Sequence, residues 1–406
     1  METLVVSGPV DEADVYKSGK LAASLTRTSD GVKFRYYADY IEGSAAAVAT
    51  TLPLTDKPVI TPAGAVPAFF AGLLPEGRRL SALRRKIKTS ADDELSLLVA
   101  VGQDTVGDVQ VVPKGSKPLE PGKPTRKLAK VSEISFDELL AEDLPLDGVG
   151  LAGVQDKVSA KNITVPVKHK NQDSILKLAP PEYPYLVENE SYFLSLANKI
   201  GIPTVDHSVV YDMNGVSGLL VTRFDRMPAQ SSDQPPQMLP VEDGGQVLGL
   251  WPADKYSPSM ERLVNALTEL CSANLVAARL AFEQVVFALL TGNGDLHAKN
   301  LSVVYRNGEW LLAPAYDLPS SLFYGDKTLA LSMVEKKTNI SRGQLTSFAA
   351  SIGLSTKVAE RVIDRLLEAT LDMEAELKAG EIPFDQHRIH ETLAVIRYRR
   401  KLLGRE

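Results

Sequence analysis

Apolar and polar residues alternate with a period of two in the first part of the chain, which is typical of β-strands. Residues 32–36 read Val-Lys-Phe-Arg-Tyr, and residues 14–26 contain a turn centred on Gly19. We therefore expect residues 1 to about 42 to form strands joined by tight turns. A further strand, over residues 107–112, is expected to close this region.

Between these strands, apolar residues recur at helical spacing, first over residues 69–74 and again over residues 80–87. The second stretch carries six Arg and Lys residues between positions 78 and 88, which fits a solvated basic face and a partner surface equally well. Ser90 and Asp93 predict the N-cap of a helix over residues 94–101.

Four prolines lie among lysines over residues 113 to about 130, with too few apolar residues to pack. Such a composition is typical of a linker or an exposed crossing loop. We therefore treat residues 1–112 as an N-terminal domain and residues 113–132 as the linker that follows it.

An apolar strand with a central lysine comes next. Residues 174–179 read Ser-Ile-Leu-Lys-Leu-Ala, and a buried Lys177 would need a partner. Glu190 lies in the first turn of the following helix, which Gly201 ends. In protein kinases a strand lysine paired with a helix glutamate positions the α- and β-phosphates of ATP. A glutamate that only favours the helix dipole would fit the same pattern.

A strand over residues 217–222 leads into the polar sequence Arg223-Phe-Asp-Arg226. In a two-lobed kinase this position is the hinge, where backbone groups contact adenine. Residues 231–237 are polar and proline-rich, which predicts a loop. We assign residues 133–250 to an N-terminal lobe that includes the hinge.

From Ser257 onward the pattern is helical. Residues 275–290 are apolar on nearly all faces, which predicts a buried helix. Residues 251–406 are therefore assigned to a helical C-terminal lobe. Its basic end, residues 397–401, fits a solvated helix face better than a nucleic-acid patch. Three amphipathic stretches are expected to close the chain: residues 343–352, 355–378 and 385–403.

Composition narrows the functional classes. The 406 residues carry a formal net charge of −6, which excludes a globally basic nucleic-acid binder. The single cysteine, Cys271, cannot form an internal disulfide, and this fits a reducing cytoplasm. The N-terminus lacks the pattern of a signal peptide, and no uninterrupted apolar run approaches about 18 residues. We expect a cytoplasmic protein with no membrane partner.

The densest cluster of reactive side chains follows the buried helix. Residues 291–300 read Thr-Gly-Asn-Gly-Asp-Leu-His-Ala-Lys-Asn, and Asp317 comes after a short hairpin. Phosphoryl transfer needs a carboxylate beside the attacking hydroxyl, then an amide oxygen and a second carboxylate for Mg²⁺. The spacing Asp-x-x-x-x-Asn equals that of the protein-kinase catalytic loop. Here, however, His297 follows the Asp rather than preceding it, and Leu-Pro follows Asp317.

Each piece alone has a simpler interpretation. Asn-Gly-Asp is commonly a turn, and a lone histidine is commonly a packed one. Residues 148–157, which read Gly-Val-Gly-Leu-Ala-Gly-Val-Gln-Asp-Lys, are able to lie over phosphates or simply to form a hairpin, and they are not a Walker A motif. The order of Asp295, Asn300 and Asp317, with apolar strands between them, is what favours phosphoryl transfer.

In combination, these motifs resemble the HipA-like toxin Ser/Thr protein kinases of bacterial type II toxin–antitoxin systems. The resemblance implies an α+β fold, with a two-lobed, protein-kinase-like core and a small N-terminal α/β coupling domain. The stretches that carry it are residues 73–78, 92–98, 100–111, 151–157, 175–177, 188–190, 223–226, 293–300 and 315–317.

The resemblance also implies roles for individual residues, with ATP and Mg²⁺ as cofactors. Asp295 is the expected catalytic acid/base, and His297 and Lys299 in the same loop are the other candidate catalytic residues. Asn300 and Asp317 are the expected Mg²⁺ ligands. Lys177, paired with Glu190, is expected to hold the ATP phosphates. The loop expected to cover the phosphates comprises Ala152, Gly153, Val154, Gln155, Asp156 and Lys157. The residues expected to line adenine are Val221, Thr222, Arg223 and Phe224.

One departure from the family pattern concerns regulation. In characterised members, a Ser shortly before the Ala-Gly-x-Gln motif is autophosphorylated, and this shuts the enzyme off. Residues 147–151 here read Asp-Gly-Val-Gly-Leu, with no hydroxyl. We therefore expect no self-inactivation in this loop, and control by a partner or through a hydroxyl elsewhere, such as Ser231 or Ser232.

Family members phosphorylate proteins, aminoacyl-tRNA synthetases among them, and bind a helix-turn-helix (HipB-like) antitoxin that brings the complex to operator DNA. We therefore expect a protein substrate, an antitoxin partner and DNA contact through the complex. Two other functions stay open: a small-molecule kinase, and a catalytically silent kinase fold that serves as a corepressor. The sequence does not identify the protein target.

Overall fold

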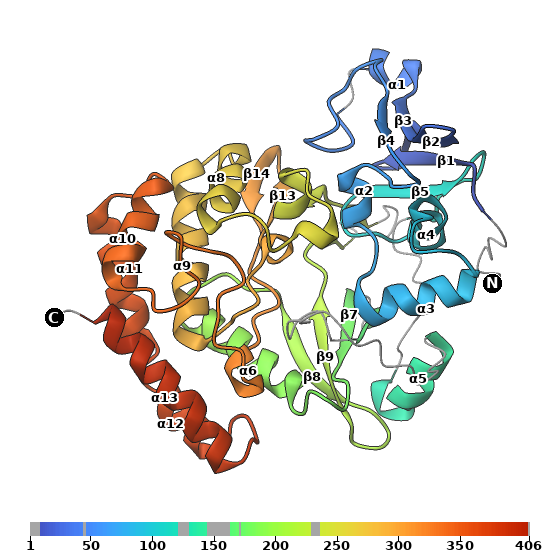
Figure 1. Ribbon diagram of the computed structural model, residues 1–406. Helices are drawn as coiled ribbons and strands as arrows, with labels where there is room; N and C mark the ends of the chain where they lie inside the picture. Colours follow the sequence, from blue (N-terminus) through green and yellow to red (C-terminus); the bar gives the residue numbers. More distant parts are fainter. Residues whose placement is uncertain are drawn as a thin grey trace.

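The protein is described here from a computed structural model that covers residues 9–43, 46–120, 130–143, 163–169, 172–228 and 236–404. In Figure 1 the N-terminal part, in blue and cyan, lies at the upper right. The central strands, in green, lie below the middle of the molecule, and the C-terminal helices, in orange and red, form its left side.

A five-stranded antiparallel sheet organises the N-terminal domain, with strand order β4-β3-β2-β1-β5. The strands expected from the period-two pattern are confirmed. For example, Leu25 of β2 (Lys20–Thr28) lies opposite Phe34 of β3 (Gly31–Tyr36), and both side chains are buried. The strands are β1 (Glu12–Lys17), β2 (Lys20–Thr28), β3 (Gly31–Tyr36), β4 (Val59–Thr61) and β5 (Val109–Pro113).

Helices complete this domain: α2 (Ala68–Gly72), α3 (Gly77–Ile87) and α4 (Glu94–Val101). The predicted N-cap of α4 is confirmed, because the Asp93 carboxylate accepts a hydrogen bond from the Ser96 N–H. The prediction of strands up to residue 42 was wrong at its end, where a short helix forms, α1 (Ala38–Glu42). There the buried ring of Tyr40 stacks on Tyr36, with ring centroids 6.0 Å apart, so the chain turns back over its own sheet.

A four-stranded antiparallel sheet forms the next part, in the order β6-β7-β9-β8. Its long helix α6 (Leu186–Lys199) packs against β8 and β9. Between α3 and this sheet, Arg79 lies within hydrogen-bond distance of Thr164. The strands are β6 (Ile163–His169), β7 (Gln172–Leu178), β8 (His207–Tyr211) and β9 (Ser217–Thr222), and the preceding helices are η1 (Val131–Glu133) and α5 (Phe136–Asp143).

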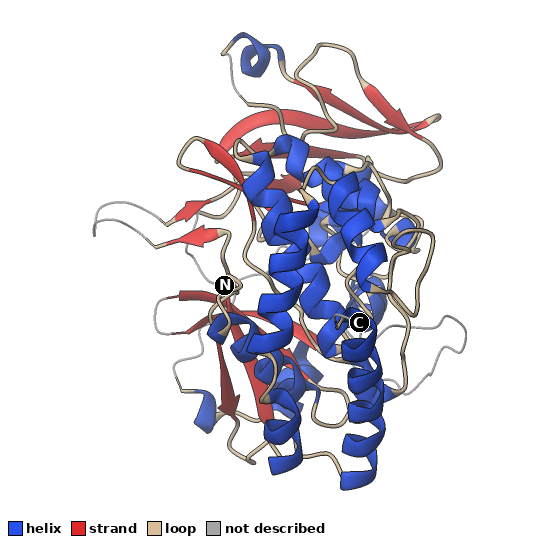
Figure 2. Ribbon diagram, turned by 90° about the vertical axis from the view of Figure 1, so that its left-hand side faces the viewer, coloured by secondary structure: helices blue, strands red, loops and turns tan. Residues whose placement is uncertain are grey.

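The C-terminal half is mainly helical. Small sheets remain in it, β10 (Arg226–Met227) with β11 (Gln237–Met238), and β12 (Val241–Asp243) with β13 (Ser302–Arg306) and β14 (Glu309–Leu312). The helices are α7 (Gly244–Val247), η3 (Pro252–Asp254), α8 (Met260–Leu270), α9 (Asn274–Thr291), η4 (Ala298–Asn300), η5 (Ser321–Tyr324), α10 (Arg342–Ser351), α11 (Thr356–Ala369), α12 (Met373–Ala379) and α13 (Gln386–Leu403). Figure 2 shows the N-terminal sheet at the top of the molecule and the β6–β9 sheet at the bottom, with blue helices filling the middle.

Helix α9 is the buried helix that the sequence predicts. It is long and apolar enough to cross a membrane by length and composition alone, yet 72% of it is buried inside the protein. Its side chains join one core that runs from Val187 in α6 to Leu403 in α13. Because α6 and the C-terminal helices share this core, the two sides of the kinase-like region are packed as one body.

One expectation for the C-terminus was wrong, and a second holds only in part. The stretch 355–378 divides into α11 and α12, because α11 ends where Arg400 of α13 donates to the Thr370 hydroxyl at 2.7 Å. The basic end is not simply a solvated face either. Arg399 is buried and donates hydrogen bonds to the backbone oxygens of Leu289 and Lys327, at 2.9 and 2.7 Å.

Candidate phosphoryl-transfer site

The loop that follows α9 is held in shape by its own side chains. Gly292 ends the helix at φ +82°, where a Cβ would lie 2.3 Å from the Leu322 side chain, so this position requires glycine. Beyond it, the Asn293 side-chain oxygen accepts the Asp295 N–H at 2.9 Å, and the Asn300 amide nitrogen donates to the Asp295 carbonyl at 2.9 Å. Asp295 is therefore buried in a loop whose backbone is fixed on both sides.

The Asp295 carboxylate has a partner that the sequence does not indicate. The hydroxyl of Tyr256 donates to Asp295 Oδ1 at 3.0 Å. Tyr256 lies between η3 and α8, 39 residues before Asp295, so neither spacing nor periodicity connects the two. A donor at this oxygen fixes the direction of the carboxylate.

Lys177 contacts two carboxylates, that of Glu190, which the sequence analysis pairs with it, and that of Asp317. Its Nζ lies 2.6 Å from Glu190 Oε1 and 3.0 Å from Asp317 Oδ1, which confirms the predicted strand–helix ion pair. Burial alone would lower the pKa of Lys177, but Asp317 and Glu190 outweigh burial and raise it. The lysine is therefore fully charged, and it brings α6 and Asp317 to the same point.

Asn189 reinforces this junction and was missed in the sequence. It is buried, its amide nitrogen donates to the Ser320 carbonyl at 3.0 Å, and its oxygen accepts the Ser320 N–H at 2.8 Å. Helix α6 thus holds the segment after Asp317 by two backbone hydrogen bonds. Polar residues early in a helix are usually exposed, so the sequence gives no signal for this contact.

The backbone at Asp317 is unusual. Its φ is +58°, a left-handed conformation that residues other than Gly, Asn and Asp seldom adopt. Asn293 of the catalytic loop donates to the Asp317 carbonyl at 3.3 Å. The loop after α9 and the Asp317 turn are therefore linked directly.

His297 is suited to structure rather than to proton transfer. Its Nδ1 accepts the Lys299 N–H at 3.2 Å and so caps η4, and its ring packs edge-on against Tyr256. Burial, with the positive charge of Lys255 nearby, lowers the pKa of His297 to about 3. The imidazole is neutral near pH 7, and its predicted catalytic role is restricted to what a neutral ring can do.

Lys299 extends toward the N-terminal domain. Its Nζ donates to the Gly72 carbonyl at 2.8 Å and lies 3.0 Å from Glu76 Oε1. Asp243 is 3.8 Å away. The ammonium of this candidate catalytic residue is therefore held by a domain contact.

The predicted adenine-lining residues lie at the end of β9, but their backbone is partly committed. The Thr222 N–H donates to the Asp206 carbonyl at 2.8 Å, and the Arg223 N–H donates to the Asp173 carbonyl at 2.9 Å. These two N–H groups are already used within the protein, so the expectation that they contact adenine was wrong. The ring of Phe224, which stacks on Tyr316 with centroids 5.8 Å apart, remains a candidate contact for adenine.

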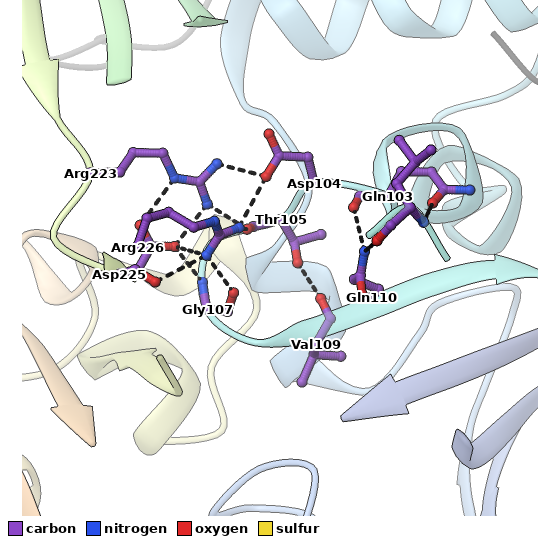
Figure 3. A network of polar contacts seen from close by, with 10 residues as sticks. Gln103, Asp104, Thr105, Gly107, Val109, Gln110, Arg223, Asp225 and Arg226 are labelled. Carbon is purple, nitrogen blue, oxygen red and sulfur yellow. Dashed lines mark hydrogen bonds and ion pairs between the residues drawn. The ribbon is translucent and has the colours of Figure 1, made fainter. Parts of the chain in front are cut away.

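The Arg223 side chain belongs to a second network, which joins the hinge to the N-terminal domain (Figure 3). Arg223 donates to Asp225 at 2.8 Å, to Asp104 at 2.7 Å and to the Thr105 carbonyl at 2.7 Å. Arg226 donates to the same two aspartates and to the carbonyls of Thr105 and Gly107. Burial would raise the pKa of Asp225, but the two arginines lower it to about 2.

Residues 152–157, the predicted phosphate loop, lie outside the described residues, so their role stays a prediction. For the metal, the described residues contain no cluster of three or more His, Cys, Asp or Glu side chains that could hold an ion alone. The predicted ligands nevertheless fit a nucleotide-bound Mg²⁺, which keeps few protein ligands. Asn300 uses its amide nitrogen on the Asp295 carbonyl, so its side-chain oxygen is the atom that would bind a cation.

The fold and this site define a class: phosphotransferases with a kinase-like core, in which a strand lysine contacts a helix glutamate and an aspartate. Family models narrow it further. The HipA-like C-terminal domain matches residues 149–373, and the HipA N-terminal domain matches residues 13–112. The chain belongs to the HipA-like kinase family, and kinases of this kind use ATP.

Individual relatives agree with this. The chain is 31% identical to "Putative kinase Y4dM" of Sinorhizobium fredii, over 87% of this chain and 88% of that one. It is 26% identical to the serine/threonine-protein kinase toxin HipA of Shewanella oneidensis, over 91% of each chain. Among solved structures, HipA of that organism, in complex with HipB and operator DNA, matches with a TM-score of 0.75 over 96% of each chain, at 22% identity. This last similarity shows the fold.

Proposed function

We propose that this chain is a serine/threonine protein kinase that transfers the γ-phosphate of ATP to a protein hydroxyl and acts as the toxin of a HipBA-type toxin–antitoxin pair. The observation that carries the proposal is the meeting of Lys177, Glu190 and Asp317, beside a catalytic loop that buries Asp295. These are the parts that phosphoryl transfer requires.

The residues divide the chemistry between them. Asp295, aimed by Tyr256, accepts the proton of the attacking hydroxyl as that oxygen bonds to the γ-phosphorus and the bond from this phosphorus to the β,γ-bridging oxygen breaks, which releases ADP. Lys177 exchanges part of its contact with Asp317 for the phosphates, while Glu190 keeps it in place. Asn300 and Asp317 would hold Mg²⁺, which neutralises charge on the phosphates when bound.

The biological setting is proposed from the family. HipA of Shewanella oneidensis has been solved with HipB and operator DNA, and we infer a helix-turn-helix antitoxin for this chain too. A net charge of −6 supports DNA contact through the complex rather than by this chain alone. We infer a cytoplasmic location, and an aminoacyl-tRNA synthetase is the first substrate to test.

A phosphoproteomic comparison tests the proposal. Host cells express the wild-type chain or Asp295→Ala, and sites that gain phosphate only with the wild type are identified. We expect new phosphoserine or phosphothreonine on few proteins, together with growth arrest. The same data should show no phosphate at residues 148–154, where the chain has no hydroxyl.

Equal phosphoproteomes for the two chains, with growth unaffected, would overturn the proposal. If the purified wild type then consumed ATP only with a small-molecule acceptor, a small-molecule kinase would replace it. If it consumed no ATP yet repressed its operator with the antitoxin, a silent corepressor would replace it.

A further inference from the structure

One carboxylate of the N-terminal domain reaches the neighbourhood of the catalytic loop. Glu76, the residue immediately before α3, lies with Oε2 2.5 Å from Lys255 Nζ and with Oε1 3.0 Å from Lys299 Nζ. Its side chain is 28% exposed, against 9% for Lys255 and 16% for Lys299. A single acid thus holds two largely buried ammonium groups from distant parts of the chain.

Both lysines are attached to the residues that position Asp295. Lys255 directly precedes Tyr256, the donor to Asp295 Oδ1, and the Lys255 carbonyl accepts the Ala298 N–H at 3.2 Å. Lys299 directly precedes Asn300, whose amide holds the Asp295 carbonyl. Glu76 therefore ties together the two segments that fix the side chain and the backbone of Asp295.

Electrostatics makes this arrangement dependent on Glu76. Two ammonium groups that approach the same carboxylate repel each other once its charge is removed, and at low exposure water screens them weakly. Asp243, at 3.8 Å from Lys299, is a more distant acid. Burial would raise the pKa of Glu76, but Lys299 and Lys255 outweigh it and lower that pKa to about 2, so the charge is present throughout the physiological range.

Two of the other contacts between the same domains end elsewhere. Thr50 donates its N–H and its hydroxyl to Glu242 of β12, at 2.8 and 2.7 Å. The Asp104 network ends on the hinge. These contacts hold the domains together without touching the loop that carries Asp295, and they provide a control for the loss of an interdomain bond.

We propose that Glu76 is a positioning residue for catalysis, through which the N-terminal domain sets the geometry of Asp295 by way of Lys255–Tyr256 and Lys299–Asn300. This deepens the proposed function and rests on it. The N-terminal domain then completes the active site, in addition to offering a surface to partners.

The test uses the purified full chain with Mg-ATP and dephosphorylated casein as the acceptor probe, and it measures kcat, the Kd for ATP and the melting temperature. In Glu76→Gln we expect kcat to fall about 10- to 100-fold, a fraction of what a general base contributes, with the Kd for ATP within about twofold of wild type. The control Thr50→Val, which removes one interdomain hydrogen bond of similar burial, should leave kcat within about twofold.

Lys255→Met removes the ion pair with Glu76 by changing the other partner. Because Glu76 is unchanged in this variant, it shows whether a loss in Glu76→Gln comes from the ion pair or from misfolding of Glu76→Gln. Its loss in kcat should not add to that of Glu76→Gln in the double variant, because the two act as one unit. Unchanged kcat in Glu76→Gln, or fully additive losses, would overturn the inference while the proposed function stands. Turnover by Asp295→Asn equal to wild type, or no turnover by the wild type with any acceptor, would overturn both.

Discussion

Two groups of charges, one around Lys177 and one at the hinge, are built differently. At the first, Lys177 contacts Glu190 and Asp317 by single bonds from one ammonium. At the second, Arg223 and Arg226 donate to Asp104, Asp225 and several backbone carbonyls through their planar guanidinium groups. An ammonium is a compact charge that is able to exchange partners, whereas an arginine fork is committed to fixed geometry.

From this difference we infer that the group around Lys177 takes part in the reaction and that the group of Arg223 and Arg226 stabilises the fold. In the proposed mechanism, Lys177 gives up its contact with Asp317 to bind a phosphate and keeps its contact with Glu190. The Arg223–Arg226 network has no such freedom, because loss of either aspartate removes one of the two counter-charges that both buried guanidinium groups share. The predictions below break one group or the other.

The largest effect should come from Asp317. We expect Asp317→Ala to lower kcat/KM by about 10³-fold or more, since the variant loses both a metal ligand and a partner of Lys177. Asp295→Asn should lower kcat by a similar factor with the Kd for ATP nearly unchanged. Steady-state kinetics with ATP titrations separates the two, and normal turnover by either purified, folded variant would contradict the site assignment.

The next largest effect is expected in the group of Arg223 and Arg226. Asp225→Ala should lower the free energy of unfolding by about 3–5 kcal/mol, because it strips a buried acid from two arginines. Urea denaturation followed by circular dichroism measures this change. Asp206→Ala, near the same hinge but with only a backbone contact in that region, is the matched control. A loss below about 1 kcal/mol in Asp225→Ala would show that the network is not a scaffold.

Asn189 tests whether α6 holds the Asp317 segment as firmly as Lys177 does. Asn189→Ala removes two hydrogen bonds and leaves the Ser320 N–H and carbonyl buried without this partner, so we expect a loss of about 2–3 kcal/mol in stability. The kcat should fall about tenfold, because Asp317 is then less well placed. Differential scanning calorimetry and kinetics give the two numbers. If stability fell without any change in kcat, Asn189 would only support the fold.

The smallest effect concerns pH. His297 has a pKa of about 3 in the folded chain and an ordinary value of 6.5, so between these values the unfolded chain binds more protons. Stability should therefore fall as pH drops below about 6.5, by about 2 kcal/mol at pH 5. Urea midpoints at pH 7 and pH 5 measure it. His297→Asn keeps an acceptor for the Lys299 N–H, and it should flatten the dependence; an equally steep dependence would assign it to another group.

Much of the fold follows from pattern. Strands β1 to β3, helix α4 and the buried helix α9 obey periodicities of 2 and 3.6 residues, which local sequence contains. The break between α11 and α12 does not, since it is set by an arginine of α13. Periodicity describes one element at a time, whereas this boundary depends on a contact between two.

The candidate site likewise has residues that could be predicted from the sequence and residues that could not. The order of Lys177, Glu190, Asp295, Asn300 and Asp317 was readable, because a known chemistry requires those types in that order. Tyr256, Asn189 and Glu76 were not, because each acts from a different element on a neighbour that only the fold supplies. The same reason explains why Lys299 was placed with the catalytic residues when its ammonium faces the N-terminal domain.

Arg399 has a consequence for synthesis. It belongs to α13, and its guanidinium holds the backbone where α9 leads into the loop that carries Asp295. A ribosome that has made the first 380 residues has released the candidate catalytic side chains but not the helix that secures them. The nascent chain therefore lacks part of the support of this loop until α13 has been made. A chain that stops before Asp385 should bind ATP weakly and lack activity in equilibrium binding and turnover assays; full activity would refute this order of events.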